Sequence, residues 1–176
     1  MQGILLIFFN LWKQYRRKFI FSFLIYFLFV IIGFVIERYQ PLLPVKNPRI
    51  AWYQYFYHNI EQSLIVIGLG VLSYGIISYA LLAFNALIAG YAIEIMIRHH
   101  LTSAIWTAFL PHAVFEIPAT ILSVVVPFMV WRLIRNRSKS TKAKPIPILR
   151  TEIVPSLVLI TLFLLVAGIM ESLFVI

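Results

Sequence analysis

Two side chains capable of acid–base chemistry stand four residues apart in the segment PHAVFEIPA, residues 111–119. On a continuous helix, His112 and Glu116 lie on one face, one turn apart, so they can touch. Pro111 and Pro118 lack amide hydrogens, which frees backbone carbonyl acceptors beside the pair. The chain has only six acidic residues. A His and a Glu in such apolar surroundings therefore predict a polar pocket in an apolar wall.

Further polar side chains are expected to share that pocket. Glu94 follows Ala86 and Gly90 at four-residue spacing, a stripe of small residues that lets another helix approach closely and places Glu94 in the contact. Glu171 lies in the last apolar segment, and Asn85 is a candidate partner for a buried carboxylate. A carboxylate at membrane depth costs about 2.5 to 3.5 kcal/mol on insertion scales. We therefore expect these groups to face the protein interior, paired or protonated.

The pair is compatible with several kinds of site: a proton or ion pathway, a metal site, an acid–base pair, or a buried hydrogen-bond network that holds helices in register. A metal site is disfavoured because His112 and Glu116 supply only two ligands and no HExxH motif is present. Intramembrane hydrolysis is disfavoured because the chain has no GxSxG motif and no Asp. We expect no metal, no cofactor and no enzymatic activity, and the network and the pathway both stay open.

Composition limits the class of protein. Apolar residues make up 62% of the chain, charged residues 12%, and the mean hydropathy is +0.94, as in an integral membrane protein. The net charge of +9 does not predict nucleic-acid binding, because the basic residues cluster at the ends of apolar runs and no soluble domain is left to bind it. The absence of cysteine excludes disulfides and thiolate chemistry. We expect one membrane domain, residues 1–176.

The apolar runs predict an all-α integral membrane protein with five transmembrane helices. The fourth run is too long for one ideal crossing and contains Pro111, Pro118 and Pro127, so we expect it to be broken or kinked. The third run is shorter than a usual span. The predicted spans are residues 19–36, 63–83, 85–97, 103–131 and 153–176.

Three segments outside the predicted spans set the orientation. Residues 1–18 are expected to form an interfacial segment, residues 37–62 an extracytoplasmic connector, and residues 132–150 a basic cytoplasmic loop. Short loops rich in Lys and Arg stay in the cytoplasm, so the basic N-terminal segment and the basic loop belong on one side. Four crossings between them satisfy this rule. The prediction is a multi-pass protein of the inner (cytoplasmic) membrane, with the N-terminus in the cytoplasm and the C-terminus outside.

The motif PHAVFEIPA resembles the Pro-His-Gly-x-x-Glu-x-x-Ala signature of the stage II sporulation protein M family. FNALIAGY resembles that family's preceding Asn-(Gly)-x-x-x-Gly segment, AGIMESLF resembles its Ala-x-x-x-Glu-x-hydrophobic segment, and Asn59 falls where the family places an Asn. Ala113 and Ala86 stand where the family has Gly, and Pro118 is an addition, so the chain resembles a divergent member. The family positions carried over are Asn85, Gly90, His112, Glu116 and Glu171.

The resemblance implies a non-catalytic subunit or scaffold of a membrane complex, because the named member works in such a complex with peptidoglycan-degrading partners. Expected partners are then other membrane proteins, among them an ATPase or a cell-wall enzyme, and lipids, with no nucleic acid. The stripe at Ala86 and Gly90 suits packing inside one chain or a homodimer. The alternative is a transporter or permease subunit, in which the fourth span lines a pathway and one Glu carries a proton.

Overall fold

The computed structural model describes residues 2–42, 51–139 and 148–173, and the elements within these ranges are all helices. Three short pieces, α4 (Thr102–Ala104) and the π-helical turns η1 (Ile105–Phe109) and η2 (Leu149–Ile153), lead into longer helices. The five long helices are α1 (Gln2–Arg38), α2 (Trp52–Leu72), α3 (Ile76–Arg98), α5 (Leu110–Lys139) and α7 (Val154–Leu173).

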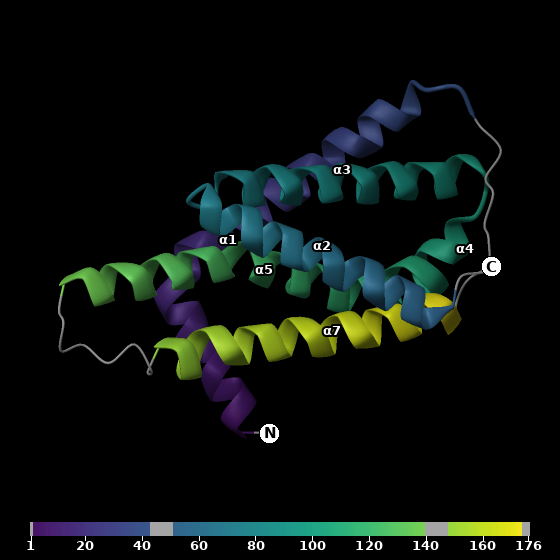
Figure 1. Ribbon diagram of the computed structural model, residues 1–176. Coiled ribbons are helices and arrows are strands. Elements are labelled where there is room, and N and C mark those ends of the chain that lie inside the picture. Colours follow the sequence, from purple (N-terminus) through teal and green to yellow (C-terminus); the bar gives the residue numbers. More distant parts are fainter. Residues whose placement is uncertain (1, 43–50, 140–147, 174–176) are drawn as a thin grey trace.

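Successive long helices run in opposite directions along the bundle (Figure 1). Lys18 lies over the ring of Phe128 and Tyr74 stacks on Trp131, so α1, the turn between α2 and α3, and α5 meet at one end. We name this the basic end. Helices α1, α3 and α7 run away from it, and α2 and α5 run back toward it. At the opposite end, Gly168 of α7 lies against the first turns of α2.

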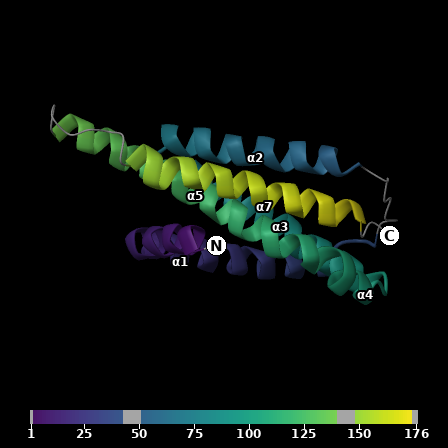
Figure 2. The same cartoon turned by 90° about the horizontal axis from the view of Figure 1, so that it is seen from below.

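Helix α5 is the central helix of the bundle. Residues 121–127 are all buried, as expected for a helix that is apolar on every side. In the apolar 18-residue stretch of Thr102–Asn136, 56% of the residues are buried. In the corresponding stretch of Leu11–Arg38 in α1, 22% of the residues are buried. Figure 2 shows the reason, because α1 and α2 lie on opposite sides with α5 and α7 between them. Residues on α5 are therefore placed to meet residues from every other long helix.

Helices α1 and α3 touch through two glycines. A Cβ at Gly90 would collide with the backbone carbonyl of Val30, and a Cβ at Gly33 would collide with that of Leu87. Ala86, one turn before Gly90, is fully buried. The close helix approach predicted at Gly90 is thus present, and its partner is α1 of the same chain. The stripe is occupied inside the subunit and does not itself supply a surface for a homodimer.

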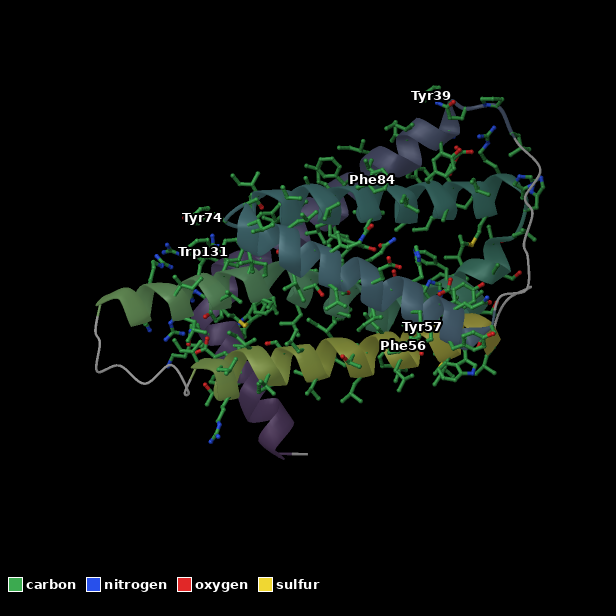
Figure 3. All side chains as sticks on the ribbon, viewed as in Figure 1. Tyr39, Phe56, Tyr57, Tyr74, Phe84 and Trp131 are labelled. Carbon is green, nitrogen blue, oxygen red and sulfur yellow. The ribbon has the colours of Figure 1, made fainter. Side chains whose placement is uncertain are left out.

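The turn between α2 and α3 is fixed by local backbone geometry and by α5. Gly75 has a φ of +91°, where residues with a Cβ are strained, and a Cβ there would also meet the ring of Phe128. The Trp131 indole donates a hydrogen bond of 2.8 Å to the Val71 carbonyl, and its ring stacks on Tyr74 at 3.9 Å between centroids. Figure 3 shows Tyr74 and Trp131 side by side at this end.

The predicted boundaries of the second and third spans are wrong. The turn at 73–75 falls inside the predicted span 63–83, so α2 ends at Leu72 and α3 continues from Ile76 to Arg98 without the expected break near 84. Helix α2 begins at Trp52, so the second half of the expected connector 37–62 is helical. Hydropathy does not mark the turn, because its Ser-Tyr-Gly sequence is embedded in apolar residues.

Four helices are long and apolar enough to cross a membrane, within the ranges that the structure describes. Helix α2 has 21 residues and packs along α5 and α7, but it is not one of the four, so composition alone does not establish a fifth span. The four are Leu11–Arg38, Ile76–Arg98, Thr102–Asn136 and Leu149–Leu173.

Two other expectations concern helix continuity. Helix α5 runs through Pro118 and Pro127 without ending, and the irregular stretch is the π-helical turn η1 that precedes Pro111. The predicted break at the prolines is therefore not confirmed. From Gln2 onward, the expected interfacial segment 1–18 is part of α1, and this helix changes direction at Tyr15 (φ −114°, ψ 15°). Of the predicted basic loop 132–150, α5 covers the first part and residues 140–147 lie outside the described ranges.

Candidate functional site

A polar cavity of about 480 Å³ lies between the five long helices, toward the end opposite the basic end. Its volume falls in the range of small-molecule sites, about 300 to 1,000 Å³. Every long helix contributes a polar side chain, although the surrounding bundle is apolar. The polar lining residues are Tyr26, Tyr55, His58, Asn59, Gln62, Asn85, His112, Glu116, Thr120 and Glu171.

Four of the predicted site residues line this cavity. Asn85 comes from α3, His112 and Glu116 come from α5, and Glu171 comes from the last turn of α7. Glu116 and Glu171 are close enough to interact electrostatically, although they are far apart in sequence. The fold therefore brings together polar groups that the sequence singled out separately.

Glu94, the fifth predicted residue, lies elsewhere. It follows Gly90 by one turn on the face of α3 that packs against α1, and it is only 3% exposed. Nearby at the same helix contact, Glu37 is 2% exposed and pairs with Arg98 at 3.1 Å. The stripe does place Glu94 in a helix contact, as predicted, but Glu94 is not among the cavity residues.

Helix α5 presents the His–Glu pair to the cavity. His112 Nε2 lies 3.8 Å from Glu116 Oε2, a distance for an ion pair and too long for a hydrogen bond. The other ring nitrogen, Nδ1, lies 2.9 Å from the Ala108 carbonyl in η1, and the ring edge packs on Phe109. If Nδ1 donates to that carbonyl, a neutral ring presents Nε2 as an acceptor toward the cavity. The imidazole is held in place, and the nitrogen facing Glu116 stays available.

Helix α2 contributes a polar face that sequence reasoning missed. Tyr55, His58, Asn59 and Gln62 are spaced three, four and seven residues after the first, so they share one side of the helix. Only Asn59 had been singled out, and only through the family resemblance. His58 Nε2 lies 2.9 Å from Gln62 Nε2. The same spacing is visible in the sequence, but the prolines before it and the tyrosines around it favour a surface connector.

Hydrogen bonds among the cavity residues stay within single helices. The contacts of His58 with Gln62, of His112 with Ala108, and of the Thr120 hydroxyl with the Glu116 carbonyl each join residues four apart. Within the described part of the chain, no hydrogen bond between two lining side chains crosses from one helix to another. The register-holding network and the pathway both stay predictions for these groups.

The model of the family described as stage II sporulation protein M matches residues 19–175. The chain belongs to the stage II sporulation protein M family. The match includes every residue lining the cavity, and it confirms the resemblance seen in the motif PHAVFEIPA. No curated protein and no solved structure matches the chain. Together with the four apolar helices, the family supports a multi-pass membrane protein.

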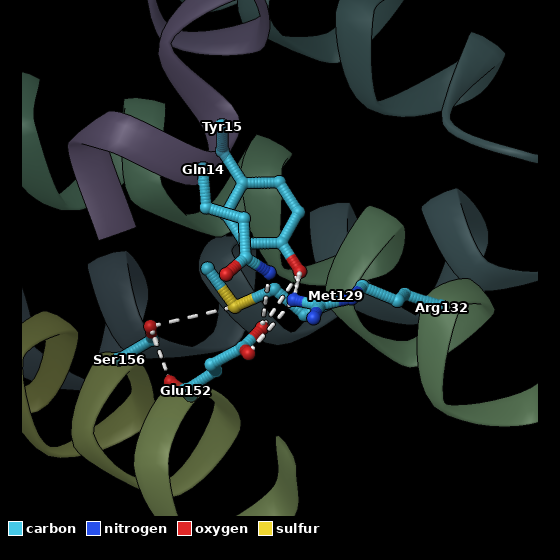
Figure 4. Close-up of polar contacts among 6 residues, drawn as sticks. All are labelled: Gln14, Tyr15, Met129, Arg132, Glu152 and Ser156. Atoms are coloured by element: carbon cyan, nitrogen blue, oxygen red, sulfur yellow. Dashed lines mark hydrogen bonds and ion pairs between the residues drawn. The ribbon is translucent and has the colours of Figure 1, made fainter. Parts of the chain in front are cut away.

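A different cluster in this stage II sporulation protein M family member does join helices, at the basic end. Arg132 of α5 pairs with Glu152 of η2 at 2.8 Å, and the same carboxylate accepts hydrogen bonds from Tyr15 at 2.7 Å and Gln14 at 3.1 Å on α1 (Figure 4). Ser156 donates to the Glu152 carbonyl at 2.7 Å. Charge-assisted bonds of this kind cross-link three segments at the change of direction in α1. The family member thus has a structural polar network, and it lies outside the cavity.

Proposed function

We propose that this family member is a non-enzymatic membrane subunit of the permease type, which binds a small polar solute in the cavity. The observation that carries the proposal is the cavity lining: polar side chains from five helices surround about 480 Å³. Polar side chains inside an apolar bundle need partners or access to a polar phase, and these line a space large enough for a small molecule. A scaffold needs no such space.

The exposure of Glu116 supports the same role. Its side chain is 37% accessible although it lies on the central helix, because it faces the cavity. A carboxylate placed to lock two helices together would instead be enclosed by donors, as Glu152 is at the basic end, where its side chain is 12% accessible. Accessibility inside the bundle is what a binding group requires.

The cavity is closed toward the basic end by packed residues. A second space of only about 10 Å³ extends from Asn59 and Gln62 to Ser123 and Leu164. Beyond it, α2, α3 and α5 meet at Gly70, where a Cβ would collide with Ser78 and would lie 2.6 Å from Pro127. In the proposed permease, this contact is the barrier that must open to release solute on that side.

The orientation of the chain belongs to the same proposal. The basic segment before Lys18 and the basic residues from Arg132 onward lie at one end, which the charge rule assigns to the cytoplasm. If α2 crosses in the reverse direction, five passes place the N-terminus inside, the C-terminus outside and the cavity in the outer half of the cytoplasmic membrane. The chain has no native cysteine, so single-cysteine labelling tests this directly. Tyr39→Cys should react from outside, and Tyr74→Cys only after permeabilisation.

Co-extraction tests the proposed function. The protein is extracted gently from its own membrane, and native mass spectrometry measures bound small molecules and partner chains in the wild type and in Glu116→Gln. The proposal predicts a small-molecule adduct that the variant loses while its assembly is unchanged. Glu61→Gln is the matched control, because Glu61 is an exposed residue of α2 that does not line the cavity. A wild type without any adduct would contradict the proposal.

Family membership supports a second candidate, a scaffold subunit whose partners are other membrane proteins such as an ATPase or a cell-wall enzyme. The same experiment separates the two candidates. A scaffold tolerates Glu116→Gln, which can still hydrogen-bond, and loses partner chains in Glu116→Leu. Stable partner chains that depend on residue 116, with no small-molecule adduct, would favour the scaffold.

A further inference from the structure

The charges that line the cavity are unbalanced. Glu116 and Glu171 face it from α5 and α7, and among the residues that the structure describes no Lys or Arg lines it. Within the described ranges, the basic groups of the lining are the imidazoles of His58 and His112. His58 is engaged with Gln62, and His112 lies at ion-pair distance from Glu116 alone. If His112 is protonated and pairs with Glu116, Glu171 still has no basic partner among the described lining residues.

The remaining polar lining consists of groups that can accept hydrogen bonds as well as donate them. The amides of Asn59, Gln62 and Asn85 each offer a carbonyl oxygen, and the hydroxyls of Tyr26 and Tyr55 can accept as well as donate. Aromatic rings come from the same two tyrosines and from Phe109. Carboxylates, carbonyl oxygens and aromatic rings are the surroundings in which proteins hold alkylammonium groups.

We propose that the solute is an organic cation, a protonated amine or a quaternary ammonium, with Glu116 and Glu171 as its counter-charges and the tyrosine rings as its walls. This inference rests on the proposed function and specifies its ligand.

The volume separates this ligand class from a bare metal ion. A cavity of about 480 Å³ is far larger than a coordination site, and the described residues contain no group of three or more His, Cys, Asp or Glu side chains placed to hold a metal. The two carboxyl groups come from different helices and line the same cavity, so a positive group between them can interact with both.

Probe binding to the purified full chain tests the inference. Thermal unfolding is followed in detergent at constant ionic strength with three kinds of probe: the cations ethanolamine, putrescine and tetramethylammonium, the neutral glucose and glycerol, and the anion succinate. A ligand that binds only the folded state raises the unfolding temperature in a saturable way. The cations, and not the other probes, should do so. Loss of one charged partner in Glu171→Gln should weaken the apparent affinity by at least about tenfold, and Glu61→Gln should not.

Two variants of Tyr55 test the inference independently, in case a carboxylate variant does not fold. Tyr55→Phe retains the ring and should keep cation binding, whereas Tyr55→Leu should weaken it several-fold. Saturable binding of glucose or glycerol that does not depend on Glu116 or Glu171 would overturn the organic-cation assignment and leave the proposed function standing. If no probe of any kind binds and no small molecule is co-extracted, the proposed function fails as well.

Discussion

Replacing Gly90 by Ala should destabilise the bundle, because the new Cβ would meet backbone and not a movable side chain. The atoms it would contact are the carbonyl of Val30 and, at 2.9 Å, the amide nitrogen of Phe34, both on α1. Helices α1 and α3 must then separate, and overpacking of this kind costs about 1 to 3 kcal/mol. Gly68→Ala is the matched control, since a Cβ there has no atom within 4 Å.

The control removes the intrinsic effect of a glycine in a helix. Replacing a helical Gly by Ala favours the helix by about 1 kcal/mol at both positions, so the difference between the two variants isolates the α1–α3 contact. For a chain of this size, about 1 to 3 kcal/mol corresponds to roughly 2 to 12 °C in the unfolding temperature. Thermal unfolding in detergent, followed by circular dichroism, measures it. Equal unfolding temperatures for Gly90→Ala and Gly68→Ala would refute the packing argument.

Two further variants test other parts of the fold by the same assay. Glu152→Gln should lower stability by about 1 kcal/mol relative to Glu61→Gln, because it breaks the pair with Arg132, which is partly exposed and therefore screened. Equal stability of these two variants would argue against a structural network at the basic end. Gly75→Ala should cost about 1 to 3 kcal/mol, since φ is +91° and the Cβ meets the Phe128 ring. An unchanged unfolding temperature would mean that the turn relaxes freely.

The sequence predicted the main polar residues of the site because they are rare in their surroundings. A His and a Glu one turn apart in an apolar segment must face the protein interior, so His112 and Glu116 could be placed without knowing the fold. Asn85 and Glu171 were also identified, and the helix-packing role of Gly90 followed from its spacing with Ala86. That Asn85 and Glu171 meet the pair depends on tertiary packing, which no local pattern specifies.

The missed features have physical causes as well. The turn at 73–75 depends on one positive φ and on a Trp131 side chain from a distant helix, neither of which changes hydropathy. The polar face of α2 lies in a segment rich in tyrosines, which suits both the membrane surface and a cavity wall. Glu94 is acidic like Glu116 and Glu171, but it lies one turn after Gly90 on the face of α3 that packs against α1, and not on the face that lines the cavity.

Water access to Thr120 is the measurement that tests the polar cavity most directly. The chain has no native cysteine, so Thr120→Cys can be labelled alone with a small water-soluble methanethiosulfonate reagent in native membranes. Two controls lie on the same helix: Ala119, fully buried, and Val114, 63% exposed on the outer surface of the bundle, where we place lipid. We expect rapid labelling at position 120 and little at positions 119 and 114. Labelling at 120 as slow as at 119 would contradict an accessible polar cavity, and with it the proposed binding function.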